Sequence, residues 1–167
     1  MSPDGCDIRK FILKGNGCAG SVYARKPALP RECKASTEPA RKLMFQVSVD
    51  EGFSAGHALR GYKGKCENPH GHNYKVRITL EGPELDSIGL LCDFTHMKRV
   101  IRSIIEGVDH KFLNDQAPFD VINPSAENLA KYFFDETKRQ MPAAPEGARI
   151  TCVTVWETDT TSATYWS

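Results

Sequence analysis

Three of the five histidines in this 167-residue chain lie within 16 residues of one another, and together they could bind a metal ion. Only Gly71 separates His70 from His72, at the start of a segment that alternates apolar and polar residues. Because alternate side chains of a strand point to the same face, both imidazoles can converge on one point. His57 follows an earlier alternating segment and would join them if the two strands pair. Three neutral imidazoles without cysteine ligands are typical of a catalytic zinc site with an open fourth position.

A thiol lies close to this cluster in the sequence. Cys66 stands four residues before His70, in a segment (61–69) with glycines, lysines and an Asn-Pro pair. So polar a loop is unusual for a buried structural cysteine. The Cys66 thiol could therefore be a fourth metal ligand, a nucleophile or a general base.

The surrounding segments must position these residues, and their patterns predict an α+β domain. Alternation predicts the strands, and Asp93 is a suitable N-cap for the first helix. In chain order we expect strands at 45–49, 74–80 and, briefly, 89–92, helices at 94–107 and from about 123 to the residue before Pro142, and strands at 150–157 and 163–166. Such a four-stranded antiparallel sheet has two free edges, and pairing between subunits into a barrel would cover them.

Composition is that of a soluble globular protein, with 40% hydrophobic and 26% charged residues. The net charge of +1 argues against a protein that coats nucleic acid or binds membranes through basic charge. No run of about 18 apolar residues is present, which excludes a transmembrane helix. We find no export signal, so we expect a cytoplasmic protein whose six cysteines are thiols or ligands.

The small net charge hides two different parts of the chain. Residues 1–43 carry nine Lys/Arg and four Asp/Glu, a net +5, whereas residues 44–167 carry thirteen and seventeen, a net −4. The first part has few large apolar residues and no hydrophobic period. We expect it to be a disordered extension, or the product of a start placed upstream of a true beginning at Met44. A transit peptide is an alternative that its four acidic residues disfavour.

Five short motifs occur together in residues 44–167. They are FSAGH (53–57), CENPHGHNY (66–74), DHKFLN (109–114), SAEN (125–128) and WET (156–158). The combination of CxxxHGH with an upstream histidine and a later Asp-His pair resembles the 6-pyruvoyltetrahydropterin synthase / 6-carboxytetrahydropterin synthase family. The resemblance covers residues 44–167 and leaves out residues 1–43.

This resemblance implies the tunnelling fold, in which ββααββ subunits join their sheets into a barrel. The usual assembly would be a homohexamer, a dimer of trimers. The substrate would be 7,8-dihydroneopterin triphosphate, bound between subunits, with no nucleic-acid or membrane partner. Zinc would be held by His57, His70 and His72. Lys63 and Lys65 could meet the triphosphate, although exposed lysines usually bind nothing specific.

The resemblance also implies the remaining site residues. Cys66 would accept a proton, and His110, with Asp109 beside it, would activate that thiol. Glu157 would anchor the amino and ring N–H groups of the pterin. Ser125 and Ala126, where the second helix starts, would also contact the substrate.

Motif spacing points to one branch of the family. Three residues separate Cys66 from His70, as in the bacterial 6-carboxy-5,6,7,8-tetrahydropterin synthases of queuosine biosynthesis, whereas the mammalian-type pyruvoyl synthases resemble CxxxxxHGH. We therefore expect a lyase that forms 6-carboxy-5,6,7,8-tetrahydropterin, acetaldehyde and triphosphate. A related subtype carries ExxHGH and makes 6-hydroxymethyl-dihydropterin for folate, and Glu67 fits that pattern. A 6-pyruvoyl product, and a non-catalytic zinc- or pterin-binding module, are the competing readings of the same residues.

Overall fold

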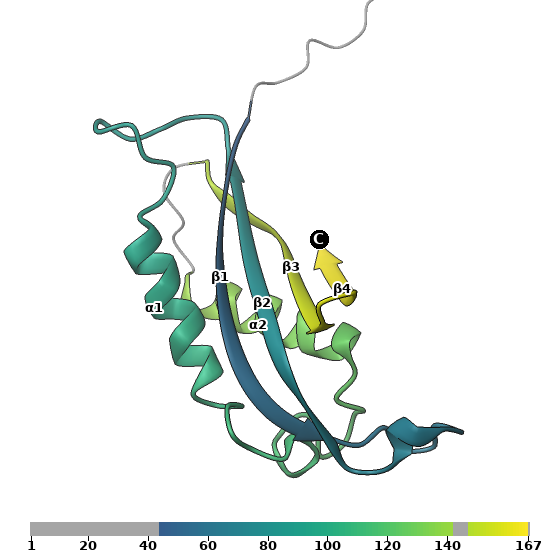
Figure 1. Cartoon of the computed structure of the whole chain (residues 1–167). Helices are drawn as coiled ribbons and strands as arrows, with labels where there is room; N and C mark the ends of the chain where they lie inside the picture. The colour runs from purple at the N-terminus through teal and green to yellow at the C-terminus, as the bar shows by residue number, and fades with distance from the viewer. Residues whose placement is uncertain (1–43, 142–146, 167) are drawn as a thin grey trace, which may run out of the picture. The chain divides into compact units, whose positions relative to one another are not determined.

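The computed structural model describes residues 44–141 and 147–166, which form a four-stranded antiparallel sheet with two helices packed on one face (Figure 1). The sheet order is β1-β2-β3-β4, so β1 and β4 are its outer strands. The elements are β1 (Phe45–His57), the 3-10 turn η1 (Lys65–Glu67), β2 (His70–Gly82), α1 (Phe94–Ile105), the 3-10 turn η2 (Leu113–Asp115), α2 (Ala126–Gln140), β3 (Arg149–Thr158) and β4 (Thr161–Trp166). The predicted α+β class and ββααββ order are confirmed. The expectation for residues 1–43 lies outside the described residues.

The first two strands are much longer than the alternation predicted. β1 and β2 pair without a register shift from Phe45↔Gly82 to His57↔His70. The sequence pattern is weak near Gly52 and Gly56, where no side chain marks the solvent face. Burial nevertheless continues on the other face through Phe53, which is 5% exposed, and on to His57. The strands therefore carry their core face as far as the histidines.

The predicted strand at 89–92 is wrong, because this segment is an irregular loop. The Asp86 carboxylate accepts hydrogen bonds from the backbone N–H groups of Ile88 (3.0 Å) and Leu90 (2.8 Å). Gly89 has a φ of +83°, which favours glycine. An aspartate that binds its own loop backbone offers those N–H groups an alternative to a strand ladder.

Helix starts follow their capping residues. The Asp93 carboxylate accepts a hydrogen bond from the N–H of Thr95 at 2.7 Å, which confirms the predicted N-cap of α1. The Ser125 hydroxyl accepts one from the N–H of Asn128 at the start of α2. Neither helix of residues 44–141 and 147–166 is long and apolar enough to cross a membrane.

The core lies between the helices and the sheet. Phe53 and Tyr74, which are opposite each other on β1 and β2, stack with ring centroids 4.9 Å apart. Phe133 of α2 packs on Phe53 at 5.5 Å and is fully buried. Other fully buried core residues are Val76, Met97, Ile101, Leu129, Val153 and Val155. This core supports the end of the sheet where the histidines lie.

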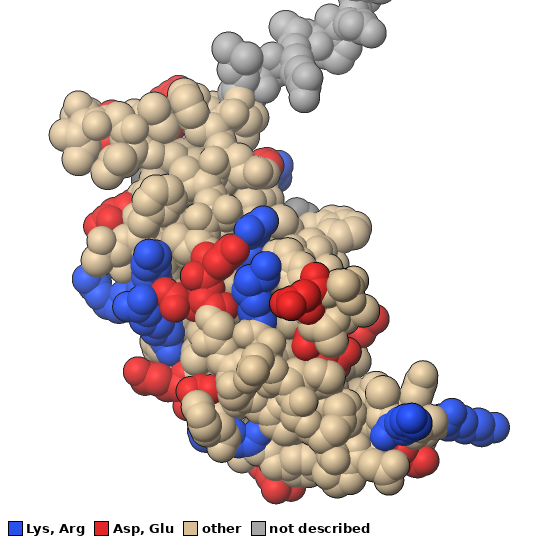
Figure 2. Space-filling view, viewed as in Figure 1, with Lys and Arg blue, Asp and Glu red and all other residues tan. Residues whose placement is uncertain are grey.

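Charged residues of both signs are interspersed over α1 and the adjoining sheet (Figure 2). Arg77 forms a paired contact with Asp50 at 2.6 and 2.7 Å, and Arg102 lies 2.8 Å from Glu51. The guanidinium of Arg77 lowers the pKa of Asp50 through this hydrogen bond. Such exposed pairs contribute only about 0.2–1 kcal/mol each, so burial of the core dominates stability.

Replacing Phe133 with alanine should therefore destabilise the fold by about 3–5 kcal/mol, because a fully buried ring would leave a cavity against Phe53. Urea unfolding at fixed protein concentration measures this loss. The control is Val121→Ala, at a side chain that is 82% exposed, which should change stability by less than about 0.5 kcal/mol. A loss below about 1 kcal/mol for Phe133→Ala would contradict this description of the core.

Candidate active site

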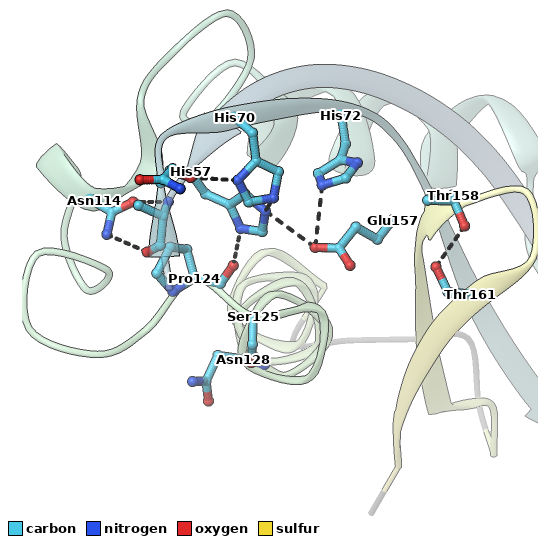
Figure 3. Close-up of polar contacts among 12 residues, drawn as sticks. His57, His70, His72, Asn114, Pro124, Ser125, Asn128, Glu157, Thr158 and Thr161 are labelled. Carbon is cyan, nitrogen blue, oxygen red and sulfur yellow. Dashed lines mark hydrogen bonds and ion pairs between the residues drawn. The ribbon is translucent and has the colours of Figure 1, made fainter. Parts of the chain in front are cut away.

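The three histidines converge at one end of the sheet, on the face that packs against the helices (Figure 3). His57 ends β1 and lies directly opposite His70, the first residue of β2, while His72 lies opposite Ala55. One ring nitrogen from each histidine lies within 4.8 Å of the others. The pairing predicted from the sequence is thereby confirmed, and the cluster could hold a metal ion.

Backbone carbonyls orient two of the imidazoles. Nδ1 of His57 lies 2.7 Å from the carbonyl oxygen of Pro124, and Nδ1 of His70 lies 2.8 Å from that of Asn68. A carbonyl can only accept, so each Nδ1 carries the hydrogen and each Nε2 of the neutral ring keeps a lone pair. Carbonyl-bound Nδ1 and free Nε2 is a common arrangement for metal-binding histidines.

The free nitrogens fit a cation. Nε2 of His57 and Nε2 of His70 are 3.1 Å apart, and two lone pairs at this distance repel unless a proton or a metal lies between them. Two nitrogen ligands of a tetrahedral zinc with bonds of about 2.0–2.1 Å would be separated by roughly 3.3 Å. Nε2 of His72 is buried and has no hydrogen-bond partner among the described residues. A metal would satisfy all three nitrogens.

Burial sets the protonation of the innermost ligand. His57 is fully buried, and this desolvation lowers its pKa. A lowered pKa keeps the imidazole neutral, which is the form that binds metal. The carboxylate of Glu157 lies 3.3 Å from Nε2 of His57 and 3.7 Å from Nε2 of His72, so a negative charge faces the cluster.

Glu157 lies near the irregularly paired end of β3. Trp156 pairs with Ser162 and Thr158 with Thr161, and the register shifts between these pairs. Because Val153 and Val155 are buried on the core face, Glu157 continues their row toward the histidines. The strand-end position expected for Glu157 is thus part of the site.

Tyr74 also borders the cluster, although its sequence position indicated only a strand residue. Its ring lies 5.5 Å from that of His72, and its hydroxyl is buried without a hydrogen-bond partner among the described residues. Burial, with a contribution from Glu157, raises the pKa of Tyr74, so the hydroxyl stays protonated and can donate. The sequence could have indicated this, because Tyr74 lies two residues beyond the HxH pair and therefore on the same face of the strand.

A cavity of about 300 Å³ adjoins the cluster and gathers several of the expected residues. Cys66, Glu157, Ser125 and Ala126 all line it. The first residues of β4 form another part of its wall, which the sequence did not indicate; the remaining lining residues are Leu59, Tyr62, Glu127, Thr161, Ser162 and Ala163. Glu67 is exposed and is not among the lining residues.

Asp109 and His110 are not among the residues that line this cavity. They interact, with His110 Nδ1 2.9 Å from the Asp109 carboxylate, and Asp109 accepts a further hydrogen bond of 2.9 Å from the N–H of Ser54. That backbone bond, followed by the bond to His110, lowers the pKa of Asp109. His110 and the cluster residue His72 line a second cavity, of about 390 Å³, which shares no lining residue with the first. Within one chain, Cys66 and Glu157 line the first cavity and His110 lines the second.

Comparison with known proteins agrees with this fold. A family model described as 6-pyruvoyl tetrahydropterin synthase matches residues 46–167. The chain is 33% identical over 128 residues to a 6-carboxy-5,6,7,8-tetrahydropterin synthase of Bacillus subtilis, covering 72% of this chain and 84% of that protein. It is 32% identical over 140 residues to the human 6-pyruvoyl tetrahydrobiopterin synthase, covering 75% and 93%. The solved 6-pyruvoyl tetrahydropterin synthase of Caenorhabditis elegans superposes with a TM-score of 0.67 at 28% identity, covering 76% and 98%.

The family model and the named relatives thus indicate that the chain, with its histidine cluster and adjoining cavity, is an enzyme of the lyase class. The chain belongs to the 6-pyruvoyl tetrahydropterin synthase family. Its relatives with the carboxy and the pyruvoyl names are equally similar to it, so overall identity does not decide between their reactions.

Replacing His72 with alanine should weaken metal binding at least about a hundredfold, because one of three nitrogen ligands is lost. The measurement is competition for zinc with a chromophoric chelator. The matched control is His96→Ala, at an exposed histidine on α1, which should leave the affinity within about twofold. Equal effects of the two substitutions would show that the cluster is not the metal site.

Proposed function

We propose that the protein is a zinc-dependent lyase of queuosine biosynthesis. It converts 7,8-dihydroneopterin triphosphate and water to 6-carboxy-5,6,7,8-tetrahydropterin, acetaldehyde and triphosphate. The observation that carries this proposal is that Cys66 and Glu157 line one cavity, while Glu157 also faces the three histidines. The name of the Bacillus subtilis relative and the three-residue spacing of CxxxHGH support the carboxy product.

Each part of the cavity has a role in this proposal. Zinc on the three histidines would polarise the side-chain oxygens of the substrate and lower their pKa. The Glu157 carboxylate accepts hydrogen bonds from the amino and ring N–H groups of the pterin. The start of α2, at Ser125 and Ala126, adds backbone N–H groups that a helix leaves unpaired. The Cys66 thiolate takes a proton from the substrate side chain, as a general base.

In this proposal His110 serves a cavity formed with another copy of the chain. Its imidazole is 81% exposed, yet Asp109 orients it and its backbone holds a φ of +53°, a conformation that non-glycine residues rarely adopt. Because the His110 imidazole is both oriented and exposed, it is suited to contact a second copy of the chain. The outer strands β1 and β4 could pair between copies, giving the barrel of a homohexamer built as a dimer of trimers.

Two further features fit the proposed substrate and compartment. Lys63 and Lys65 are exposed in and beside η1, the turn that also carries Cys66, and they place positive charge where a triphosphate could bind. Such local charge matters because residues 44–167 carry a net −4. Cys66 is a free thiol, which suits the reducing cytoplasm.

The 6-hydroxymethyl reaction is the strongest competing function, because Glu67 completes an ExxHGH pattern. Cys66 and Glu67 are neighbours in the 3-10 turn η1, where successive side chains point about 120° apart, and only Cys66 is among the residues that line the cavity. Cys66 faces it and Glu67 is exposed, which favours the thiol as the acid–base group. The same assay also tests for a 6-pyruvoyl product and for a non-catalytic zinc- or pterin-binding module.

The proposal predicts opposite results for the two neighbours. With zinc-loaded protein and 7,8-dihydroneopterin triphosphate, Cys66→Ala should lower formation of the 6-carboxy product by about 10²–10⁴-fold, because the general base is lost. Glu67→Ala should change it by less than about threefold, as should the thiol control Cys152→Ala on β3. Products are identified and quantified by mass spectrometry.

The outcomes separate the candidate functions. No turnover by the unaltered protein would refute the lyase proposal and favour a binding module. A 6-hydroxymethyl or 6-pyruvoyl product would refute the carboxy assignment. Loss of activity in Glu67→Ala with full activity in Cys66→Ala would reverse the roles of the two residues.

A further inference from the structure

We propose that Asn114 and Asn123 are positioning residues that hold residues 58–60 in place, and that this segment couples the metal ligand His57 to the Cys66 thiol. The inference rests on the proposed function only in giving those two groups their catalytic meaning. Asn114 ends a motif that the metal and acid–base roles do not account for, and Asn123 precedes the SAEN motif. The geometry assigns both a task.

Each asparagine makes two hydrogen bonds to the backbone of a single residue. Oδ1 of Asn114 accepts from the N–H of Ala58 at 2.8 Å, and its Nδ2 donates to the carbonyl of Ala58 at 2.8 Å. Asn123 repeats this at Arg60, accepting from its N–H at 2.8 Å and donating to its carbonyl at 3.0 Å. Just beyond the end of β1, the two side-chain amides thus make the hydrogen bonds that a neighbouring strand would otherwise make to the backbone (Figure 3 shows Asn114).

The backbone groups of Leu59, which lies between Ala58 and Arg60, point to the opposite side. The N–H of Leu59 donates to the carbonyl of Cys66 at 2.8 Å, and the carbonyl of Leu59 accepts from the N–H of Tyr62 at 3.2 Å. In an extended chain, successive residues direct their backbone groups to opposite sides. Fixing Ala58 and Arg60 from one side therefore aims Leu59 at Cys66 on the other side.

The loop that carries Asn123 also contacts His57, the candidate metal ligand. Asn123 directly precedes Pro124, whose carbonyl accepts the hydrogen bond from Nδ1 of His57. The side chain of Asn128 donates to the carbonyl of Asn123 at 2.8 Å, which ties this loop to α2. His57 is thus held by Pro124 on its ring and by the Asn114 contact on the residue that follows it.

Only an amide can make both bonds of this contact, because it carries a donor and an acceptor side by side. Aspartate keeps the acceptor but places a second oxygen against the backbone carbonyl. Alanine removes both bonds. Both asparagines are half-buried, and a polar side chain in such a position needs hydrogen-bond partners. The backbone groups of Ala58 and Arg60 supply them.

The test uses the full chain with Asn114→Ala, Asn123→Ala and Asn114→Asp, and Gln46→Ala as the control. Gln46 is an exposed amide that bonds to Glu81 at the opposite end of the sheet. The first measurement is the alkylation rate of Cys66 by iodoacetamide in metal-free protein, resolved by peptide mass spectrometry. Cys152 of β3, which is also partly exposed, serves as an internal reference in every sample.

Loss of either contact should raise the ratio of Cys66 to Cys152 alkylation about tenfold, because one or two hydrogen bonds no longer hold the thiol loop. Asn114→Asp should resemble Asn114→Ala, and Gln46→Ala should leave the ratio unchanged. The second measurement, chelator competition, should show zinc affinity reduced about tenfold in Asn114→Ala and Asn123→Ala. If turnover is present, kcat should fall more than KM rises.

A general loss of stability would raise the alkylation of both cysteines together and leave their ratio unchanged, and that result would overturn the proposal. A ratio that falls, or full retention of zinc affinity in both alanine variants, would overturn it as well. Alkylation of metal-free protein does not depend on the reaction catalysed. The positioning role can therefore be confirmed or refuted even if the carboxy product is not formed.

Discussion

The unshifted pairing of β1 with β2 is the constraint on which the site depends. It runs from Phe45↔Gly82 to His57↔His70, and it places His57, His70 and His72 on the face that the helices cover. A slip of one residue would turn one strand's side chains to the opposite face. The stacked Phe53 and Tyr74 oppose such a slip, because it would move a buried aromatic ring into water. Packing of the core therefore holds the histidines in register.

Placing polar groups at the end of a hydrophobic face has a cost. The ring nitrogen of His72 and the hydroxyl of Tyr74 are buried without partners among the described residues, and each such group costs about 1–3 kcal/mol. A ligand that satisfies them only in the folded state stabilises that state by mass action. The cluster is thus built at the expense of local stability, and a ligand bound there would offset that loss.

The sequence predicted the histidine cluster better than it predicted the loop at 89–92. The HxH spacing and the alternation of β2 were sufficient to bring three imidazoles together, because strand geometry is regular. The loop at 89–92 was misassigned because the Asp86 side chain competes for backbone N–H groups, which apolar alternation does not reveal. The separation of His110 from Cys66 could not be predicted, since it depends on the packing of a turn against β1. The two asparagine contacts were hidden because they act on backbone atoms.

The overlap of Cys66 and Glu67 shows how a sequence pattern can allow two chemistries where the backbone favours one. Both CxxxHGH and ExxHGH are present. The cysteine of the first and the glutamate of the second are neighbours in the short turn η1, and their side chains point in different directions. The orientation of that turn is held by the bond from Leu59 to the Cys66 carbonyl, and Leu59 lies between the contacts made by Asn114 and Asn123. Two asparagines more than forty positions away in the sequence thus hold the backbone segment that bonds to turn η1.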